Sequence, residues 1–150
     1  MPSHRKPRML LAVGLATAAL GVAAPSPATA PAGRYSIAAG VVTDTQSGLK
    51  WQQAHDTATR DFNAAAAFCA SLNLGGSGWR VPSVKELLTI VDDSKQNPSI
   101  DTAAFPSTSV GFFWTSSKYA KTGDGYYVDF RWGDSYYSAT TTKYYVRCVK

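Results

Sequence analysis

The chain has 150 residues, and its 15 Lys and Arg against 10 Asp and Glu give a formal net charge of +5 at pH 7. Three of the basic residues, Arg5, Lys6 and Arg8, lie at the very start, so residues 31–150 hold 12 basic against 10 acidic residues. This near balance excludes the strongly basic surface of a typical nucleic-acid-binding protein. The 120 residues after position 30 suit one domain and are too few for two ordinary ones.

The start of the chain has the organisation of a secretory signal peptide. A basic stretch precedes an apolar run at 9–24, and Ala28-Thr29-Ala30 has the small-x-small form of a cleavage site. The alternative, a transmembrane anchor, needs ~20 apolar residues, more than this run supplies. We therefore expect a signal peptide at 1–30, a short lead-in at 31–40 and a domain at 41–150. The mature chain is expected to be secreted, periplasmic or on the cell surface, with no stable membrane insertion.

The next part of the chain predicts a hairpin followed by two helices. Short apolar pieces within 35–44 and alternation at 49–52 flank turn residues, a pattern typical of an opening hairpin. Helical spacing predicts a first helix over 59–72. Its expected apolar face is Phe62, Ala65, Ala66, Cys69 and Leu72, with Thr59 or Asp56 as the cap. A second helix is predicted over 82–92, because Ser-x-x-Glu at 83–86 forms a capping box.

Aromatic strands are predicted from residue 112 onward. Their expected ranges are 112–116, 126–132, 135–139 and 144–149. In the second of these, alternation places Tyr126, Val128, Phe130 and Trp132 on one face and Tyr127, Asp129 and Arg131 on the other. Strands, two helices and strands in this order predict an α+β fold with helices beside an antiparallel sheet.

Two cysteines, Cys69 and Cys148, lie 79 positions apart. In an oxidising compartment two cysteines most simply pair, and closing so long a loop stabilises by about 4 kcal/mol. The alternatives are two free thiols, or a metal or redox pair. A C-x-x-C spacing is missing, and His55 is the only histidine in residues 31–150, so the sequence favours the disulfide.

Six motifs, in a fixed order, resemble those of a known protein family. They include Asp44-x-x-Ser47-Gly48-Leu49-x-Trp51, Ala67-Phe68-Cys69, Trp79-Arg80-Val81-Pro82-Ser83-x-x-Glu86-Leu87, Ile100-Asp101 with Phe105-Pro106, Phe113-Trp114-Thr115-Ser116-Ser117 and Tyr145-Val146-Arg147-Cys148-Val149. Over roughly residues 41–150 the chain resembles the C-terminal domain of bacterial collagen-like adhesins, the Lcl C-terminal domain family.

The resemblance implies a variant of the C-type-lectin fold, with a disulfide between Cys69 on the first helix and Cys148 on the last strand. It also implies an exported, often adhesive, protein. In the best-known member the domain binds sulfated glycosaminoglycans, and most members have no known activity. This chain lacks the collagen Gly-x-y repeats of that member. Trimerisation driven by collagen therefore does not carry over.

The motif residues are expected to be structural. They are Trp51, Trp79, Arg80, Pro82, Glu86 and Trp114. We expect Trp79 to fill the core and Arg80 to pair with a buried acid or with carbonyl groups. Pro82 is expected at the first helical position, which tolerates proline. The alternative for Trp51 and Trp114 is an exposed platform on which sugars stack.

The C-terminal third carries the candidate ligand-binding residues. They are Tyr127, Arg131, Tyr137, Lys143, Tyr145 and Arg147. Alternation places the three tyrosines opposite the apolar set, and exposed aromatic rings often mark interaction surfaces. Arg131, Lys143 and Arg147, together with Lys118 and Lys121, could receive sulfate or carboxylate groups. Interleaved Asp124, Asp129 and Asp134 support the alternative of a mixed solvated surface.

Catalysis and metal binding find little support in the sequence. His55 has no accompanying nucleophile or metal motif, and the Glu-Pro-Asn and Trp-Asn-Asp motifs of calcium-dependent lectins are missing. We therefore expect no enzyme, no cofactor, no metal and no nucleic-acid partner. The leading hypothesis is a secreted or cell-surface module that binds anionic or polymeric glycans without calcium. The alternative is a structural or protein-interaction module of the cell envelope, with envelope proteins as partners.

Overall fold

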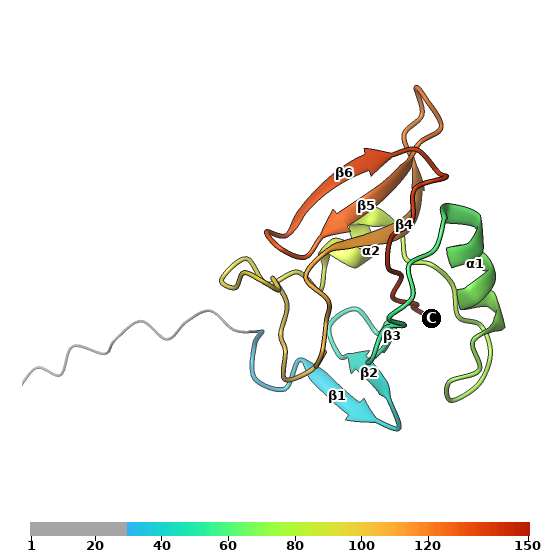
Figure 1. Ribbon diagram of the computed structural model, residues 1–150. Coiled ribbons are helices and arrows are strands. Elements are labelled where there is room, and N and C mark those ends of the chain that lie inside the picture. The colour runs from blue at the N-terminus through green and yellow to red at the C-terminus, as the bar shows by residue number, and fades with distance from the viewer. Residues whose placement is uncertain (1–29) are drawn as a thin grey trace, which may run out of the picture.

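The computed structural model describes residues 30–150, which form two antiparallel sheets, two helices and one disulfide (Figure 1). The expected signal peptide lies outside the described residues except for Ala30. The architecture is α+β, as the order of predicted elements indicated. The single expected sheet is, however, two separate three-stranded sheets.

The first sheet contains β1 (Tyr35–Ala38), β2 (Val41–Asp44) and β3 (Lys50–Gln52), in the order β1-β2-β3. The stretch 35–44, expected to form one side of a hairpin, therefore forms two strands, β1 and β2. Ala39 and Gly40 both have positive φ, 49° and 78°, which suits the tight turn between β1 and β2.

The second sheet contains β4 (Phe112–Lys118), β5 (Gly125–Asp129) and β6 (Asp134–Ser138), in the order β4-β5-β6. The strand predicted over 126–132 ends early, because the backbone turns and the Gly133 amide donates to the Asp129 carbonyl at 2.8 Å. Trp132 therefore lies in this turn with 55% of its surface exposed. Its expected place beside Val128 and Phe130 on the buried face was wrong.

Helix α1 (Phe62–Ser71) begins three residues later than predicted. Its cap is Asp61, whose carboxylate accepts from the Ala64 amide at 2.8 Å, rather than Thr59 or Asp56. Arg60 forms a β-bridge with Tyr144, and this pairing excludes it from the helix. Of the expected apolar face, Ala66 is exposed.

Helix α2 (Val84–Leu88) has only five residues, although its predicted capping box is present. Val91 leaves the helix because it pairs with Ile100. Pro82 lies before the cap, not at the first helical position, and its carbonyl accepts from the Ser116 amide at 2.7 Å. The proline thus ties the start of α2 to β4.

The last segment, residues 144–149, is not the continuous strand that was predicted. It forms isolated bridges instead: Tyr145 pairs with Phe113 of β4, and Val149 pairs with Trp51 of β3 and with Arg80. The segment therefore links the two sheets. It also carries Cys148, which is bonded to Cys69 of α1 at 2.03 Å, so the predicted disulfide is confirmed.

Two hydrophobic clusters lie on opposite faces of the second sheet. Adjacent side chains of a strand point to opposite faces. Phe113 accordingly packs in one cluster with Leu87 of α2, while Trp114 packs in the other with the disulfide. The second sheet is thus covered on both faces around Phe113 and Trp114. Phe112, at the start of β4, borders the candidate site.

Candidate functional site

A pocket of about 260 Å³ lies where the start of β4 meets the last segment of the chain. It is lined by Thr59, Val110, Gly111, Phe112, Arg131, Lys143, Tyr144 and Tyr145. These residues come from four separate stretches of the chain. The pocket therefore exists only in the folded protein.

Aromatic rings form much of the pocket wall. The Phe112 and Tyr144 ring centroids are 5.1 Å apart, and both rings contact Tyr127 behind them, at 4.9 and 4.8 Å. Tyr127 in turn contacts Tyr136 of β6 at 6.1 Å, and 53% of the Tyr136 surface is exposed. An aromatic surface therefore runs from the pocket across the sheet to its edge strand.

Backbone hydrogen bonds hold Tyr145 in the wall. Its amide donates to the Phe112 carbonyl at 3.0 Å, and its carbonyl accepts from the Trp114 amide at 2.9 Å. Gly111 makes room for the ring, since a Cβ there would lie 3.3 Å from the Tyr145 side chain. A larger residue at position 111 would press on the ring.

Two cations, Arg131 and Lys143, line the pocket, and their surroundings differ. Arg131 lies 4.6 Å over the Phe112 ring and donates through Nε and Nη2 to the Asp129 carboxylate, with a closest contact of 2.8 Å. This hydrogen bond raises the pKa of Arg131. Lys143 is exposed and makes no ion pair within residues 30–150. Lys143 therefore offers the uncompensated positive charge of the pocket.

The environment of Tyr127 differs from that of a surface tyrosine. Burial raises its pKa, and the neighbouring Tyr144 and Asp129 add to the effect. Tyr127 thus contributes an uncharged aromatic ring to the back of the site.

The structure brings together some of the predicted ligand-binding residues. Arg131, Lys143 and Tyr145 line the pocket, and Tyr127 packs behind it. Tyr137 lies elsewhere: it pairs with Tyr126, on the other face of the sheet, and stacks on Tyr119 at 4.4 Å.

Arg147 is fully buried, which corrects its expected role as a surface group for anions. Its guanidinium donates to the Gln52 carbonyl at 2.7 Å, to the Gln53 carbonyl, and to Thr108 Oγ1 at 2.8 Å. It also lies 4.8 Å from the Phe105 ring. Burial lowers the pKa of Arg147 to about 9. Arg147 therefore organises the interior and does not reach a ligand in the pocket.

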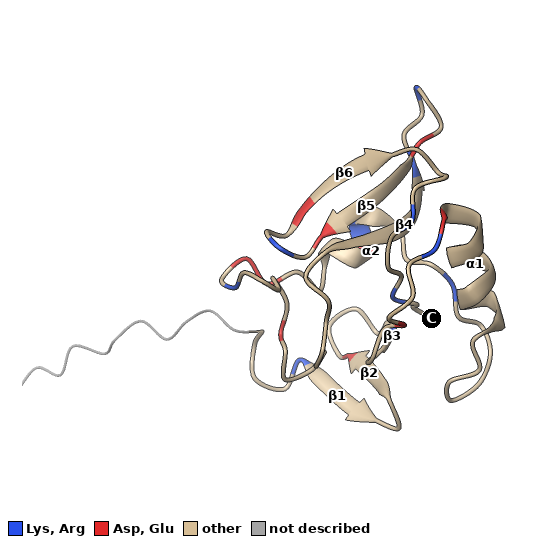
Figure 2. Ribbon diagram, in the orientation of Figure 1, with Lys and Arg blue, Asp and Glu red and all other residues tan. Residues whose placement is uncertain are grey.

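The five basic residues considered as anion-binding candidates do not form one patch. Lys118 lies six positions along β4 from Phe112, roughly 20 Å at ~3.3 Å per residue. Its ammonium rests over the Phe62 ring at 5.3 Å. Figure 2 shows Lys and Arg interspersed with Asp and Glu along the chain. The charges thus favour the mixed surface, with Arg131 and Lys143 as the pair that shares a pocket.

The tryptophans of the motifs are interior residues. Trp51 and Trp114 are fully buried, and Trp79 Nε1 donates to the Leu74 and Gly76 carbonyls at 3.0 Å. The alternative of an exposed tryptophan platform is therefore wrong for these residues. Trp132 is the exposed tryptophan of the described residues.

Arg80 pairs with Glu86 at 2.6 Å. The Arg80 side chain is 51% exposed and the Glu86 side chain 24%, so the acid that was expected to be buried is partly exposed. The hydrogen bond from Arg80 is the main reason that the pKa of Glu86 falls to about 2. Glu86 Oε2 also accepts from the Ser83 amide at 2.7 Å. One carboxylate thus holds both Arg80 and the capping box.

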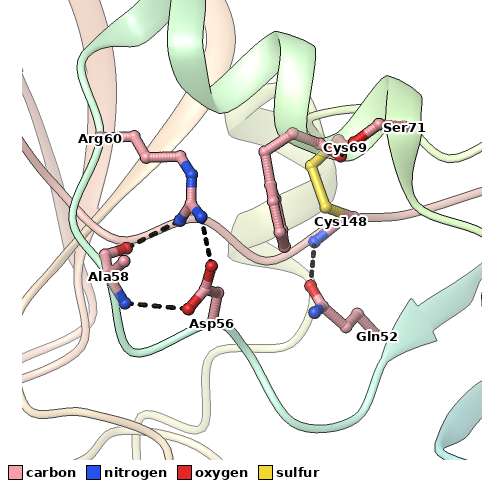
Figure 3. Close-up of a disulfide and its surroundings, with 8 residues drawn as sticks. Gln52, Asp56, Ala58, Arg60, Cys69, Ser71 and Cys148 are labelled. Atoms are coloured by element: carbon pink, nitrogen blue, oxygen red, sulfur yellow. Dashed lines mark hydrogen bonds and ion pairs between the residues drawn. A yellow bond between two sulfur atoms is a disulfide. The ribbon is translucent and has the colours of Figure 1, made fainter.

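The disulfide lies outside the pocket and joins α1 to the last segment (Figure 3). The Cys148 amide donates to Gln52 Oε1 at 3.2 Å, and Arg60 forms an ion pair with Asp56 near α1. Both cysteines are fully buried. The bridge is therefore structural.

The pocket residues that the sequence did not predict are Thr59, Val110, Gly111, Phe112 and Tyr144. A signal for Phe112 was present in the aromatic pair Phe112-Phe113. Adjacent residues of an extended chain point to opposite sides, so both members of such a pair cannot enter the same core. Here Phe113 is buried, and Phe112 lines the pocket.

Comparison with known families shows that the model of the Lcl C-terminal domain matches residues 40–150. The chain belongs to the Lcl C-terminal domain family. This family is associated with extracellular adhesins, which suggests a cell-surface or adhesin-like module. No curated protein matches the chain.

Among residues 30–150, no three or more His, Cys, Asp or Glu side chains are grouped so that they could hold a metal ion. Neither helix in the described part of the chain has the length and apolar character needed to cross a membrane.

Proposed function

We propose that this Lcl domain is a secreted or cell-surface binding module that recognises anionic or polymeric glycans without calcium. The observation that carries the proposal is the pocket in which Phe112, Tyr144 and Tyr145 lie beside Arg131 and Lys143. Ligand pockets are typically apolar or aromatic with a few polar groups that fix orientation. A pyranose ring has apolar faces that suit the aromatic wall, while a sulfate or carboxylate suits the cations.

The two cations have different expected roles. Lys143 has an uncompensated charge and is therefore the group expected to pair with an acidic substituent. Arg131 is held over Phe112 by Asp129, so its remaining N–H groups are expected to meet neutral hydroxyls or a shared anion. Direct contact between cations and an anionic sugar requires no bridging metal, which supports a calcium-independent mode.

The test compares two lysine variants of the oxidised protein for binding to heparin and to a glycan array, with and without chelator. Lys143→Gln removes the free cation of the pocket, and Lys121→Gln removes an exposed lysine outside it. We expect K143Q to weaken heparin binding about tenfold, the equivalent of ~1.4 kcal/mol, with a clearly smaller effect of K121Q. Equal effects of the two variants would show non-specific electrostatic attraction. Binding to no glycan at low salt would overturn the proposal.

The same proposal assigns the domain to binding and not to catalysis. Both cysteines are joined in the disulfide, and both ring nitrogens of His55 are hydrogen-bonded to the backbone. These groups are therefore engaged structurally. The disulfide between the first helix and the last segment further supports the C-type-lectin-like variant of the fold that we propose.

A protein-interaction module is the second candidate function. It is favoured by β6, which lies at the edge of the second sheet and exposes about half of both Tyr136 and Tyr137. An edge strand can pair with a strand of another chain. Binding to envelope proteins, with no retention on any glycan, would favour this candidate.

A further inference from the structure

His55 is a buried histidine in the loop after β3, with 7% of its surface exposed. Its Nδ1 lies 2.7 Å from the Asp56 carbonyl, and its Nε2 accepts from the Ser109 amide at 2.9 Å. A carbonyl can only accept, so the ring proton is on Nδ1. Both hydrogen bonds therefore require the neutral imidazole with this tautomer.

The imidazole supports two parts of the pocket wall. Ser109, which it holds, is followed directly by Val110 and Gly111, and both of these line the pocket. The ring also packs against Tyr145, at 5.3 Å between centroids. His55 thus contacts the pocket from behind although it does not line it.

The groups that face His55 come from three parts of the chain. Arg147, of the last segment, carries a buried positive charge that opposes protonation, and Asp56, of the same loop, favours it. The Ser107 backbone, in the loop before β4, also favours the protonated ring, and Tyr145 contacts it as an uncharged phenol. Burial dominates, and it lowers the pKa of His55.

Protonation would change which backbone group the ring can bind. A protonated Nε2 cannot accept from the Ser109 amide, but it can donate to a carbonyl. Protonation therefore removes the hydrogen bond that holds Ser109. Ser107 has a φ of +57°, a conformation that non-glycine residues rarely adopt, so this loop is held in a strained form by its surroundings.

We propose that His55 is a positioning residue of the pocket: its neutral ring holds the wall at 109–111, and its protonation breaks the Ser109 bond and reshapes the pocket. The effect on ligands rests on the proposed function, whereas the effect on the wall does not. An unperturbed histidine titrates near ~6.5. Because the pKa in the folded protein is lower, the wall is intact at neutral pH and is released only on acidification.

The test is a pH titration of the full chain by nuclear magnetic resonance, from about pH 8 to about pH 5. The signals followed are the His55 ring and the Ser109 and Gly111 amides. We expect both amides to shift with the same midpoint as the His55 ring, below ~6.5. If the ring titrates and the amides do not follow it, the proposal is overturned. This outcome can be read from the native protein alone.

His55→Gln provides the matched control, because glutamine can accept from the Ser109 amide but does not titrate. The Gly111 shift should disappear in H55Q, whereas the amide signal of Lys121, an exposed residue outside the pocket, should be unchanged. A Gly111 shift that persists in H55Q would assign the titration to another group and would contradict the proposal.

Heparin binding is a second measurement, because the direction in which affinity changes with pH distinguishes the proposal from non-specific attraction. Acid makes any protein more positive, so non-specific attraction to heparin strengthens as the pH falls. The proposal predicts the opposite for the native protein, a loss of about fivefold or more that H55Q does not show. Stronger binding of both proteins in acid would refute control of the ligand site by His55. If heparin does not bind at any pH, the proposed function fails, and the amide titration still decides the role of His55.

Discussion

Residues 143–149 contain two regions with contrasting environments. Lys143 is exposed, and Tyr144 and Tyr145 are half-buried at the pocket, whereas residues 146–149 are all buried. The change takes place between two adjacent residues, because the chain passes from the edge of the pocket into the space between the two sheets. One short segment thus belongs to both the candidate site and the core.

Two arginines show what this difference means. Arg147 and Arg131 each lie over a phenylalanine ring, at 4.8 and 4.6 Å. Arg147 is fully buried and donates to carbonyls and a hydroxyl, whereas Arg131 is partly exposed and bound to Asp129. The same type of side chain thus stabilises the interior at position 147 and lines a surface pocket at position 131. Changes in the interior region should therefore affect folding, and changes at the pocket should affect binding.

Removal of the disulfide is expected to have the largest effect on the interior. In the double variant Cys69→Ser and Cys148→Ser, the 79-residue separation is no longer bridged, so the unfolded chain regains conformational entropy. We expect a loss of about 4 kcal/mol in the free energy of unfolding. Denaturant unfolding followed by fluorescence measures it, with the reduced native protein as a control that should behave alike. A loss below about 1 kcal/mol would contradict the expected role of the bridge.

Substitution of Arg147 should have the next largest effect. Arg147→Met keeps much of the side-chain volume but leaves the Gln52 and Gln53 carbonyls and Thr108 without their donor. We expect a loss of about 3 kcal/mol in unfolding free energy. Arg147→Lys, which retains a charge but fewer donors, should lose less. An R147M protein as stable as the native one would show that these hydrogen bonds contribute nothing net.

Substitution of Lys143 should have the smallest effect on stability. Lys143→Gln removes an exposed charge that has no ion pair within residues 30–150, so the free energy of unfolding should change by less than about 0.5 kcal/mol. Its heparin affinity should nevertheless fall, as expected for a pocket residue. A K143Q protein that is strongly destabilised would remove the distinction between the two regions.

Local interactions explain the features that were predicted correctly. Ser83 and Glu86 are three residues apart, and their capping box depends only on the backbone between them. The end of α2 depends instead on the pairing of Val91 with Ile100, a contact that no local pattern contains. The length of α1 is likewise shortened by the bridge between Arg60 and Tyr144. Long-range pairing overrode helical spacing in both cases.

The candidate site was predictable in part for the same reason. Alternation along the strands indicated that Tyr127 and Tyr145 differ from the buried set, and both lie at the pocket. It did not place Tyr137, because the strand register decides which tyrosine of β6 lies beside Tyr127. Tyr136 pairs with Tyr127, so Tyr137 lies on the opposite face. Nor did it show that Arg147 is buried, since its partners Gln52, Gln53 and Thr108 are distant in the sequence.

The sequence by itself determined the α+β order of elements, the pairing of Cys69 with Cys148, and membership of the Lcl family. These follow from local periodicity, from the cysteine count and from ordered motifs. Only the tertiary structure decided that Arg131 and Lys143 share a pocket while Arg147 stays inside. The reason is physical: burial and charge pairing depend on segments that meet in space. The sequence of one segment does not show which distant segments pack against it.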